Sequence, residues 1–172
     1  MKKDIIGFYE GVVKNQEGYT IDDIISYDVF SDEKLEENHC YIQWIFPLPE
    51  KSKTVPDSPV LRKSDIKTFN NRPDLQNKMR TMFNIMLNFY GLNICENKVK
   101  TARGEWHLRY PVWLTTNNHN FLRISRMLKS MKLLGLKHES QMFYDFLCVL
   151  YGYNKNTIGP VTKEFWDEAI TK

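Results

Sequence analysis

The stretch that decides the fold class covers residues 118–135 and reads NHNFLRISRMLKSMKLLG. Its apolar residues recur every three or four positions, which is the spacing of one face of an α-helix. The stripe ends just before Gly135, a residue type that often terminates helices because it adopts the left-handed conformation easily. The sequence therefore predicts a helix from about Asn118 to Leu134, and its core face is expected to hold Ile124, Met127, Leu128, Met131 and Leu134.

Similar signals predict helices along the rest of the chain. Thr20 and Asp23 form a capping-box pattern, in which each side chain satisfies an amide of the first helical turn. Ser31 opens a helix that is expected to stop at Pro47, and Pro73 takes the first position of a helix that ends near Gly91. Further helices are expected over residues 64–69, over residues 142–150 with an end near 152, and over residues 162–171, where Thr162 is the expected cap.

Strand signals are poor by comparison. Residues 47–60 contain four prolines and are expected to form an extended loop, and residues 92–104 a hairpin-like or irregular loop. No repeat or long linker divides the 172 residues. The sequence therefore predicts one mostly α domain over residues 1–172, a compact irregular helical bundle with a core over about 8–150 and a C-terminal helix at about 162–171.

Composition indicates a globular intracellular protein. Hydrophobic residues make up 42% and aromatic residues 13% of the chain, more than disordered proteins contain. The three cysteines, Cys40, Cys95 and Cys148, are far apart and odd in number, which argues against a disulfide framework or a zinc knuckle. No apolar run suits a signal peptide or approaches the roughly 18 residues that span a bilayer. We expect a soluble protein of the cytoplasm or of the nuclear or perinuclear region, without a transmembrane segment.

Charge is unevenly distributed along the chain. Residues 1–50 hold four Lys and eleven acidic residues, whereas residues 98–137 hold nine Lys or Arg and one acidic residue, Glu105. The basic segment could form an anion-binding or nucleic-acid-binding surface. The alternatives are that the two halves attract each other or that both are simply solvated. The aromatic and basic residues of 103–110 could likewise stack single-stranded bases, or belong to a loop folded onto the core.

The first candidate site residues lie before Pro47. On a helix through residues 35–46, His39 would lie within about 60° of Leu35, Ile42 and Phe46, on the apolar face. A buried histidine that holds a hydrogen bond, with Gln43 as a partner one turn on, is then expected instead of a general base. Cys40 would point about 100° away from His39, so the two could not act as a catalytic pair.

The second group of candidates lies in the stretch quoted above. His119, Arg123, Arg126 and Ser130 fall within about 60° of one another on the predicted helix and form a polar face. Such a face near a helix start suits a carboxylate, a phosphate or an acidic peptide. Alternatively, its arginines pair with acidic residues of the N-terminal half, such as Asp32, Glu33, Glu36 and Glu37. The methionines of the helix before Gly91 could form a plastic peptide groove or fill the core.

No cofactor or metal chemistry is indicated. No two of the four histidines, His39, His107, His119 and His138, lie three or four positions apart, and no HExxH occurs. The eight glycines are dispersed, so no phosphate-binding loop is predicted. We expect no cofactor, no metal and no catalytic residues; an enzyme built around His39, Gln43 and His119 is the least supported hypothesis.

Several segments in order resemble the opioid growth factor receptor conserved region. They are Phe8-Tyr9, ENHCYIQWIFPL (37–48), Pro59-Val60-Leu61, MLNFYGL (86–92) and HNFLRISRMLKSM (119–131). The resemblance implies a non-enzymatic receptor that binds an enkephalin-type pentapeptide, restrains cell growth and, in vertebrates, is associated with the nuclear envelope. The expected pocket lies between the helices of 39–46 and 123–130, where Tyr41 or Trp44 would meet an aromatic ring of the ligand and Arg123 or Arg126 its carboxylate. The ligand-binding candidates are His39, Gln43, Trp44, His119, Arg123, Arg126 and Ser130.

Overall fold

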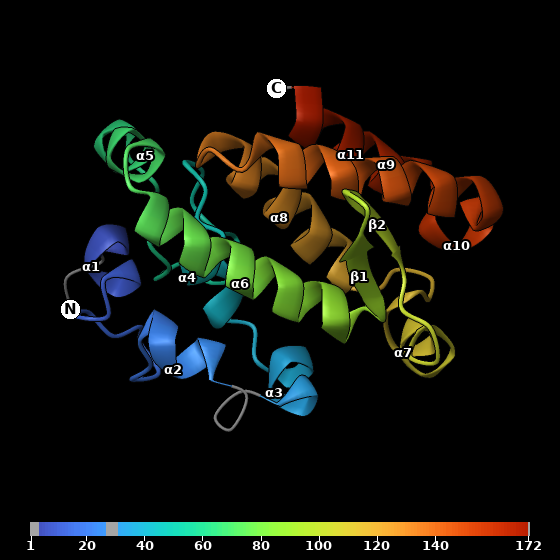
Figure 1. Ribbon diagram of the computed structural model, residues 1–172, viewed down its shortest axis with the longest axis horizontal. Helices are drawn as coiled ribbons and strands as arrows, with labels where there is room; N and C mark the ends of the chain where they lie inside the picture. Colours follow the sequence, from blue (N-terminus) through green and yellow to red (C-terminus); the bar gives the residue numbers. More distant parts are fainter. Residues whose placement is uncertain (1–3, 27–30, 172) are drawn as a thin grey trace. The chain divides into compact units, whose positions relative to one another are not determined.

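The computed structural model describes residues 4–26 and 31–171, and most of them are helical (Figure 1). The sheet in this described part of the chain is a two-stranded antiparallel hairpin. The predicted fold class, mostly α, is therefore confirmed. The chain divides into two compact units, Met1–Met82 and Phe83–Lys172, and the single domain over 1–172 stays a prediction.

Short helices make up most of the N-terminal unit. The capping box predicted at Thr20 and Asp23 is present at the start of α2, since the side chain of each residue accepts from the backbone amide of the other. The loop predicted over residues 47–60 is also confirmed. The helices are α1 (Ile5–Tyr9), α2 (Ile21–Ile25), α3 (Asp32–Glu37), α4 (Tyr41–Ile45), α5 (Lys63–Asn70) and the first part of α6 (Pro73–Phe89).

Aromatic side chains form the centre of this unit. The ring of Tyr9 meets that of Phe69 edge-on at 4.8 Å, and Phe8 lies 5.2 Å from Trp44, measured between ring centroids. The Tyr9 hydroxyl donates to the carbonyl oxygen of Ile45 at 2.5 Å. Burial raises the pKa of Tyr9 well above its ordinary value, because the phenolate would be desolvated. The phenol therefore stays a donor and joins α1 to α4.

The single helix predicted from Ser31 to Pro47 is wrong. The chain forms α3 and α4 instead, and they are separated by residues 38–40. The Asn38 side chain accepts from the amide of Cys40 at 2.8 Å, which is the local bond that lets asparagine replace a helical turn. The side-chain oxygen of Asn38 thus provides the acceptor that the helix ladder would otherwise supply.

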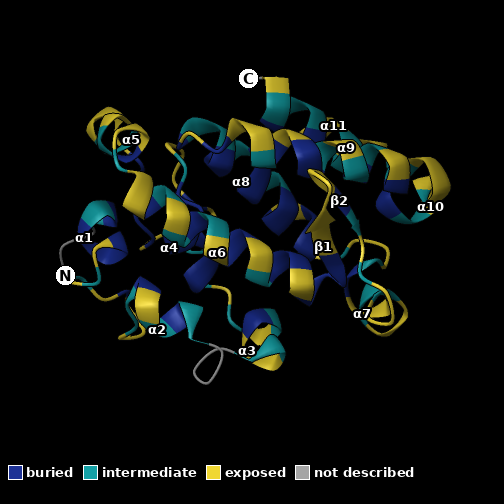
Figure 2. Ribbon diagram, in the orientation of Figure 1, coloured by how far each residue is buried: buried dark blue, intermediate teal, exposed yellow. Residues whose placement is uncertain are grey.

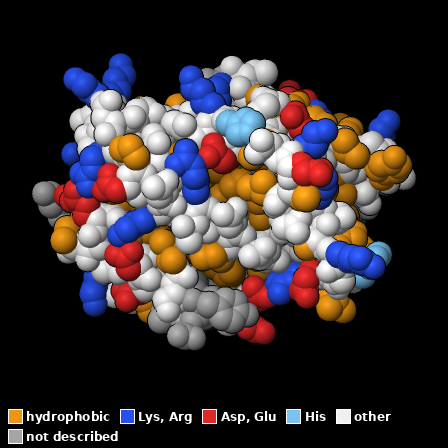
Figure 3. All heavy atoms as spheres, viewed as in Figure 1, with side chains coloured by type: hydrophobic (Ala, Val, Ile, Leu, Met, Phe, Trp, Pro, Cys, Tyr) orange, Lys and Arg blue, Asp and Glu red, His pale blue; other side chains and the backbone are white. Residues whose placement is uncertain are grey.

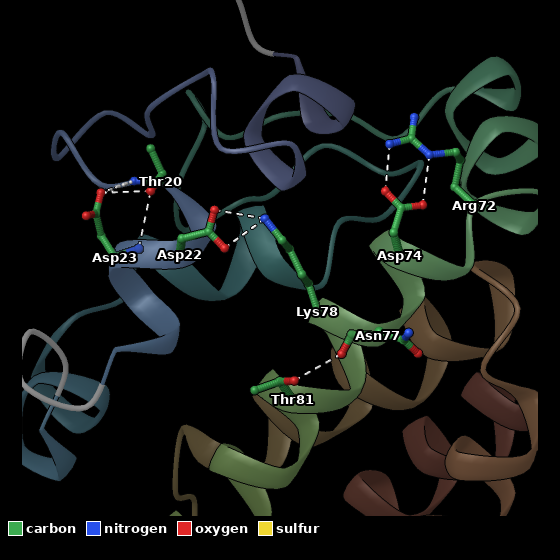
Figure 4. Close-up of polar contacts among 8 residues, drawn as sticks. All are labelled: Thr20, Asp22, Asp23, Arg72, Asp74, Asn77, Lys78 and Thr81. Carbon is green, nitrogen blue, oxygen red and sulfur yellow. Dashed lines mark hydrogen bonds and ion pairs between the residues drawn. The ribbon is translucent and has the colours of Figure 1, made fainter.

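Polar contacts join α6 to earlier helices of the same unit. Lys78 forms an ion pair with Asp22 of α2 at 2.7 Å, and the Arg72 guanidinium forms two hydrogen bonds to Asp74 at 2.7 and 2.8 Å (Figure 4). Arg72 also pairs with Glu10 at 2.9 Å. These pairs are partly exposed, so we expect them to orient the helices more than to stabilise them.

The C-terminal unit contains longer helices. Its elements after α6 are β1 (Leu92–Cys95), β2 (Lys98–Thr101), α7 (Trp106–Trp113), α8 (Asn120–Leu133), α9 (Lys137–Tyr153), α10 (Lys155–Ile158) and α11 (Pro160–Thr171). The hairpin is confirmed, and its two turn residues, Glu96 and Asn97, have φ of 52° and 56°. Positive φ at both positions is typical of the tight turn that matches strand twist. The helix predicted at 118–134 is also confirmed as α8.

Helix α8 is covered by α9 and α11. The Ser140 hydroxyl donates to the Leu128 carbonyl at 2.8 Å, and the Trp166 indole donates to the Phe121 carbonyl at 3.2 Å. Figure 2 accordingly draws much of α8 as buried. The predicted core residues of α8 are all buried. Met79, Met82 and Met86 of α6 are buried as well, as expected of methionines that fill a core.

Two helices of this unit were not predicted correctly. Residues 106–113 form helix α7, which was not predicted: a loop folded onto the core was one of the two interpretations of residues 103–110. Pro111 lies inside this helix although it cannot donate a helical hydrogen bond. The C-terminal helix begins at Pro160, and Thr162 lies inside it instead of capping it. Proline suits the first position of a helix, because its missing N–H has no helical partner there anyway.

Candidate functional site

Three of the seven predicted ligand-binding residues, His39, Gln43 and Trp44, lie in the N-terminal unit. Trp44 has no exposed surface, and its indole donates to Gln16 Oε1 at 2.6 Å. Tyr41 is equally buried, and its hydroxyl donates to the Leu35 carbonyl at 3.0 Å. Neither aromatic ring reaches the surface, so neither can meet a ligand without a rearrangement of the unit.

His39 is exposed, whereas Gln43, its expected partner, is buried. The prediction that His39 is buried on an apolar helix face is wrong, because the residue lies in the break between α3 and α4 and is exposed. Gln43 is only 5% exposed. With its amide nitrogen turned toward the backbone, it donates to the carbonyl oxygens of His39 at 2.6 Å and Cys40 at 3.3 Å. The glutamine thus supports the turn before α4.

The other four predicted residues lie on or next to α8 and divide between the interior and the surface. Ser130 is fully buried, Arg123 is 5% exposed, Arg126 is half-buried, and His119 is exposed at the N-cap position. The predicted polar face therefore lies at the boundary between buried and exposed surface. The solvent-exposed side of α8 instead includes Leu122, which is 60% exposed.

A buried asparagine that the sequence analysis missed accompanies Arg123. Asn120 has no exposed surface, and its side-chain oxygen accepts from Arg123 Nη1 at 3.2 Å and from the Tyr90 hydroxyl at 3.4 Å. Its amide nitrogen donates to Asn118 Oδ1 at 3.0 Å. This network fixes the first turn of α8. Hydrogen-bonded in this way, the Arg123 guanidinium acts as part of the fold of the C-terminal unit.

The most exposed apolar side chains near this network come from α7 and α8. Leu108 is 72% exposed, Val112 is 51% exposed, and the two lie four residues apart on α7. Asn118, one turn before Leu122, donates from its amide to the Val112 carbonyl at 3.0 Å. We call Leu108, Val112 and Leu122 the apolar line. The sequence offers a signal for part of it, since Leu108 and Val112 have helical spacing and each follows a residue that is not a core aliphatic, His107 and Pro111.

The aromatic side chains of α7 pack against one another. Trp106 stacks on Tyr110 with ring centroids 5.3 Å apart and planes inclined by 25°, and Trp113 is fully buried. The Trp113 indole donates to the Tyr90 carbonyl at 3.1 Å. Core packing therefore accounts for most of this aromatic surface, as one of the two sequence interpretations expected.

A second polar cluster joins α9 to α11. The Tyr144 hydroxyl donates to Asp167 Oδ1 at 2.5 Å, and Lys163 forms an ion pair with the same carboxylate. Burial opposes ionisation of Asp167, but the hydrogen bonds from Lys163 and Tyr144 outweigh it and lower the pKa of the carboxyl. The hydrogen bond between the Tyr144 hydroxyl and Asp167 is the main cause that raises the pKa of Tyr144. The cluster thus holds two helices together with a protonated phenol and an ionised carboxylate.

A further apolar surface lies at the C-terminal end of α9. Val149 is 62% and Tyr153 86% exposed there, and Figure 3 shows apolar side chains gathered at this end of the unit.

Among residues 4–26 and 31–171, no three His, Cys, Asp or Glu side chains are grouped as a metal site would require. None of the helices described is both long and apolar enough to cross a membrane.

Comparison with known proteins gives a consistent family. The family model of the opioid growth factor receptor conserved region matches residues 2–164. The opioid growth factor receptor of Mus musculus is 33% identical over 135 residues, and that of Homo sapiens is 31% identical over 135 residues. Both alignments cover 77% of this chain. The opioid growth factor receptor-like protein 1 of Mus musculus is 32% identical over 130 residues, which are 74% of this chain.

The relatives are much longer proteins. The matched region is 21% of the mouse receptor, 20% of the human receptor and 28% of the mouse receptor-like protein 1. No solved structure matches the chain.

Proposed function

The chain belongs to the opioid growth factor receptor conserved-region family, and from this premise we propose that it is a non-enzymatic module that binds a peptide or a protein. The names of its relatives support this proposal, because they describe receptors and receptor-like proteins. Since the matched region is between 20% and 28% of these relatives, a receptor's complete activity is not transferred with it. The ligand implied by the family name is an enkephalin-type pentapeptide.

The apolar line is the observation that carries the proposal. A helix normally buries its apolar residues, but Leu108, Val112 and Leu122 stay more than half exposed. Groups of exposed apolar side chains bordered by polar residues are typical of interaction sites. The seven residues chosen from the sequence stay candidates, although Gln43, Trp44, Arg123 and Ser130 are buried and can act only through the fold.

The proposal can be tested with a fluorescently labelled enkephalin-type pentapeptide. Anisotropy titration of the wild-type protein should give saturable binding, and Leu122→Asp should weaken it about tenfold or more, because the charge disrupts an apolar contact. The matched control is Val149→Asp on α9, where the side chain is exposed to the same extent, 62% against 60%. A folded wild-type protein that does not bind the peptide would overturn its role as a receptor for this ligand.

Nucleic-acid binding by residues 98–137 is the alternative. A labelled single-stranded oligonucleotide in the same assay should then bind with an affinity that falls steeply with salt, because phosphate contacts release counterions. Binding of the oligonucleotide that is insensitive to Leu122→Asp, together with no peptide binding, would favour this alternative.

A further inference from the structure

We infer that the apolar line selects an acidic ligand: a segment of a partner protein or peptide whose apolar side chains are accompanied by carboxylates. This inference rests on the proposed peptide- or protein-binding function and adds the chemical class of the ligand. It is carried by the exposed apolar side chains of α7 and α8 and by the distribution of charge around them.

The apolar line comes from two helices that a hydrogen bond joins. Leu108 and Val112 are one turn apart on the same face of α7, so their side chains are about 6 Å apart along the axis. The bond from Asn118 to the Val112 carbonyl holds the end of α7 against the turn that precedes Leu122. A ligand with two apolar residues one helical turn apart would therefore find partners at matching intervals.

Carboxylates are absent from this part of the sequence. No Asp or Glu occurs from Trp106 to His138, a segment that contains all of α7 and α8. The two acidic residues that precede it are both neutralised: Glu96 pairs with Lys100 at 2.7 Å, and Glu105 pairs with Arg109 at 2.9 Å. Nothing on these two helices therefore repels an incoming carboxylate.

Positive charge lies at the Leu108 end of the line. Arg103 is exposed in the turn just before α7, five residues before Leu108. Within the described ranges 4–26 and 31–171, Arg103 forms no ion pair. A ligand carboxylate near the residue that meets Leu108 would thus gain an attractive interaction.

The other apolar surface of this unit does not have this charge pattern. Val149 and Tyr153 lie on α9, which also carries Asp145 on its exposed side, and α11 carries Glu164 and Glu168. Acidic and basic residues are therefore mixed around that surface, since Lys155 is exposed two residues after Tyr153. The combination of exposed apolar side chains with a carboxylate-free surrounding thus distinguishes α7 and α8.

The test uses two short synthetic peptides that differ only in charge. Each has two leucines one helical turn apart, flanked by glutamates in one peptide and by glutamines in the other. Titration of the complete chain at low salt should show that the glutamate peptide binds about tenfold more tightly, and moderate salt should reduce this ratio because it screens exposed charges. Arg103→Gln should weaken the glutamate peptide about threefold and leave the glutamine peptide unchanged. Lys155→Gln, an exposed change on α10, is the matched control and should alter neither.

The outcomes separate the inference from the proposed function. Leu122→Asp should weaken both peptides, because it removes a contact that they share. If the two peptides bind equally and Leu122→Asp weakens both, peptide binding stands and the acidic preference is overturned. If neither peptide binds but the enkephalin-type pentapeptide does, the inference is likewise overturned. If no peptide binds to the folded protein, the inference and the proposed function both fail.

Discussion

Replacing Gly91 with alanine should reveal how closely α7 packs on the chain after α6. Gly91 has a φ of +75°, a left-handed conformation that side chains disfavour. An added Cβ would lie 3.0 Å from the Cα of Trp106 and 3.2 Å from the Cβ of Arg109. The first of these atoms is backbone, so relief of the contact requires a shift of α7 itself.

Two terms determine the expected loss of stability. The left-handed backbone costs an alanine about 1–2 kcal/mol. Forcing a carbon atom into a well-packed contact typically costs about 1–3 kcal/mol more. Gly91→Ala should therefore lower the free energy of unfolding by about 2–5 kcal/mol, which for a chain of this length is roughly 5–15 °C in melting temperature.

Gly104 provides the control for the backbone term. Its φ is +84°, but an added Cβ would meet no atom within 4 Å, so Gly104→Ala should cost only the first 1–2 kcal/mol or so. Both variants would be unfolded in urea and followed by circular dichroism. Equal losses of stability, within about 0.5 kcal/mol, would refute the close packing of α7 on Gly91.

Two further predictions concern individual hydrogen bonds. The hydrogen bonds from Arg72 lower the pKa of Asp74 to about 2. The ionised Asp74 carboxylate therefore stabilises the folded state fully above its ordinary pKa of 3.8, and this stabilisation is lost as the pH falls toward 2. A carboxyl titration by NMR should show this midpoint, and Arg72→Gln should return it toward 3.8; an unchanged midpoint would contradict the assignment. Ser140→Ala should lower the free energy of unfolding in urea by about 0.5–1.5 kcal/mol, because the buried bond to the Leu128 carbonyl is lost. A loss no larger than that of the exposed Ser64→Ala would show that this bond is not stabilising.

Helices with a strong apolar period were predictable from the sequence. The stretch at 118–135 became α8 within two residues at its start and one at its end, because its stripe covers the core at helical spacing. Pro73 and Gly91 bound α6 as predicted, the first at the initial helical position and the second in a left-handed conformation. These signals are local and need no knowledge of the rest of the fold.

Elements whose character depends on their surroundings were predicted less well. Asn38 ended a helix that the apolar pattern would have continued, since its side chain competed with the backbone for an amide. Helix α7 was missed because Pro111 and the clustered aromatics favour a loop when read alone. In the folded chain Trp113 holds the end of α7 in place, since its indole is buried and donates to the Tyr90 carbonyl.

The candidate site shows the same division. Helical spacing grouped His119, Arg123, Arg126 and Ser130 on one side of the predicted helix, but it could not say which of them face the interior. Burial of α8 under α9 and α11 decided that question and turned Leu122 outward. The orientation of a helix about its own axis depends on which neighbours it packs against.

The sequence by itself determined the helical class, the ends of its most periodic helices and the family. These depend on residue spacing, capping and matched segments, which are properties of the chain alone. The tertiary structure alone decided that Trp44 and Gln43 are buried, that His39 is exposed, and that Leu108, Val112 and Leu122 lie at the surface. The physical reason is that apolar side chains become interior only where another element covers them, and that covering is made by residues far apart in the sequence.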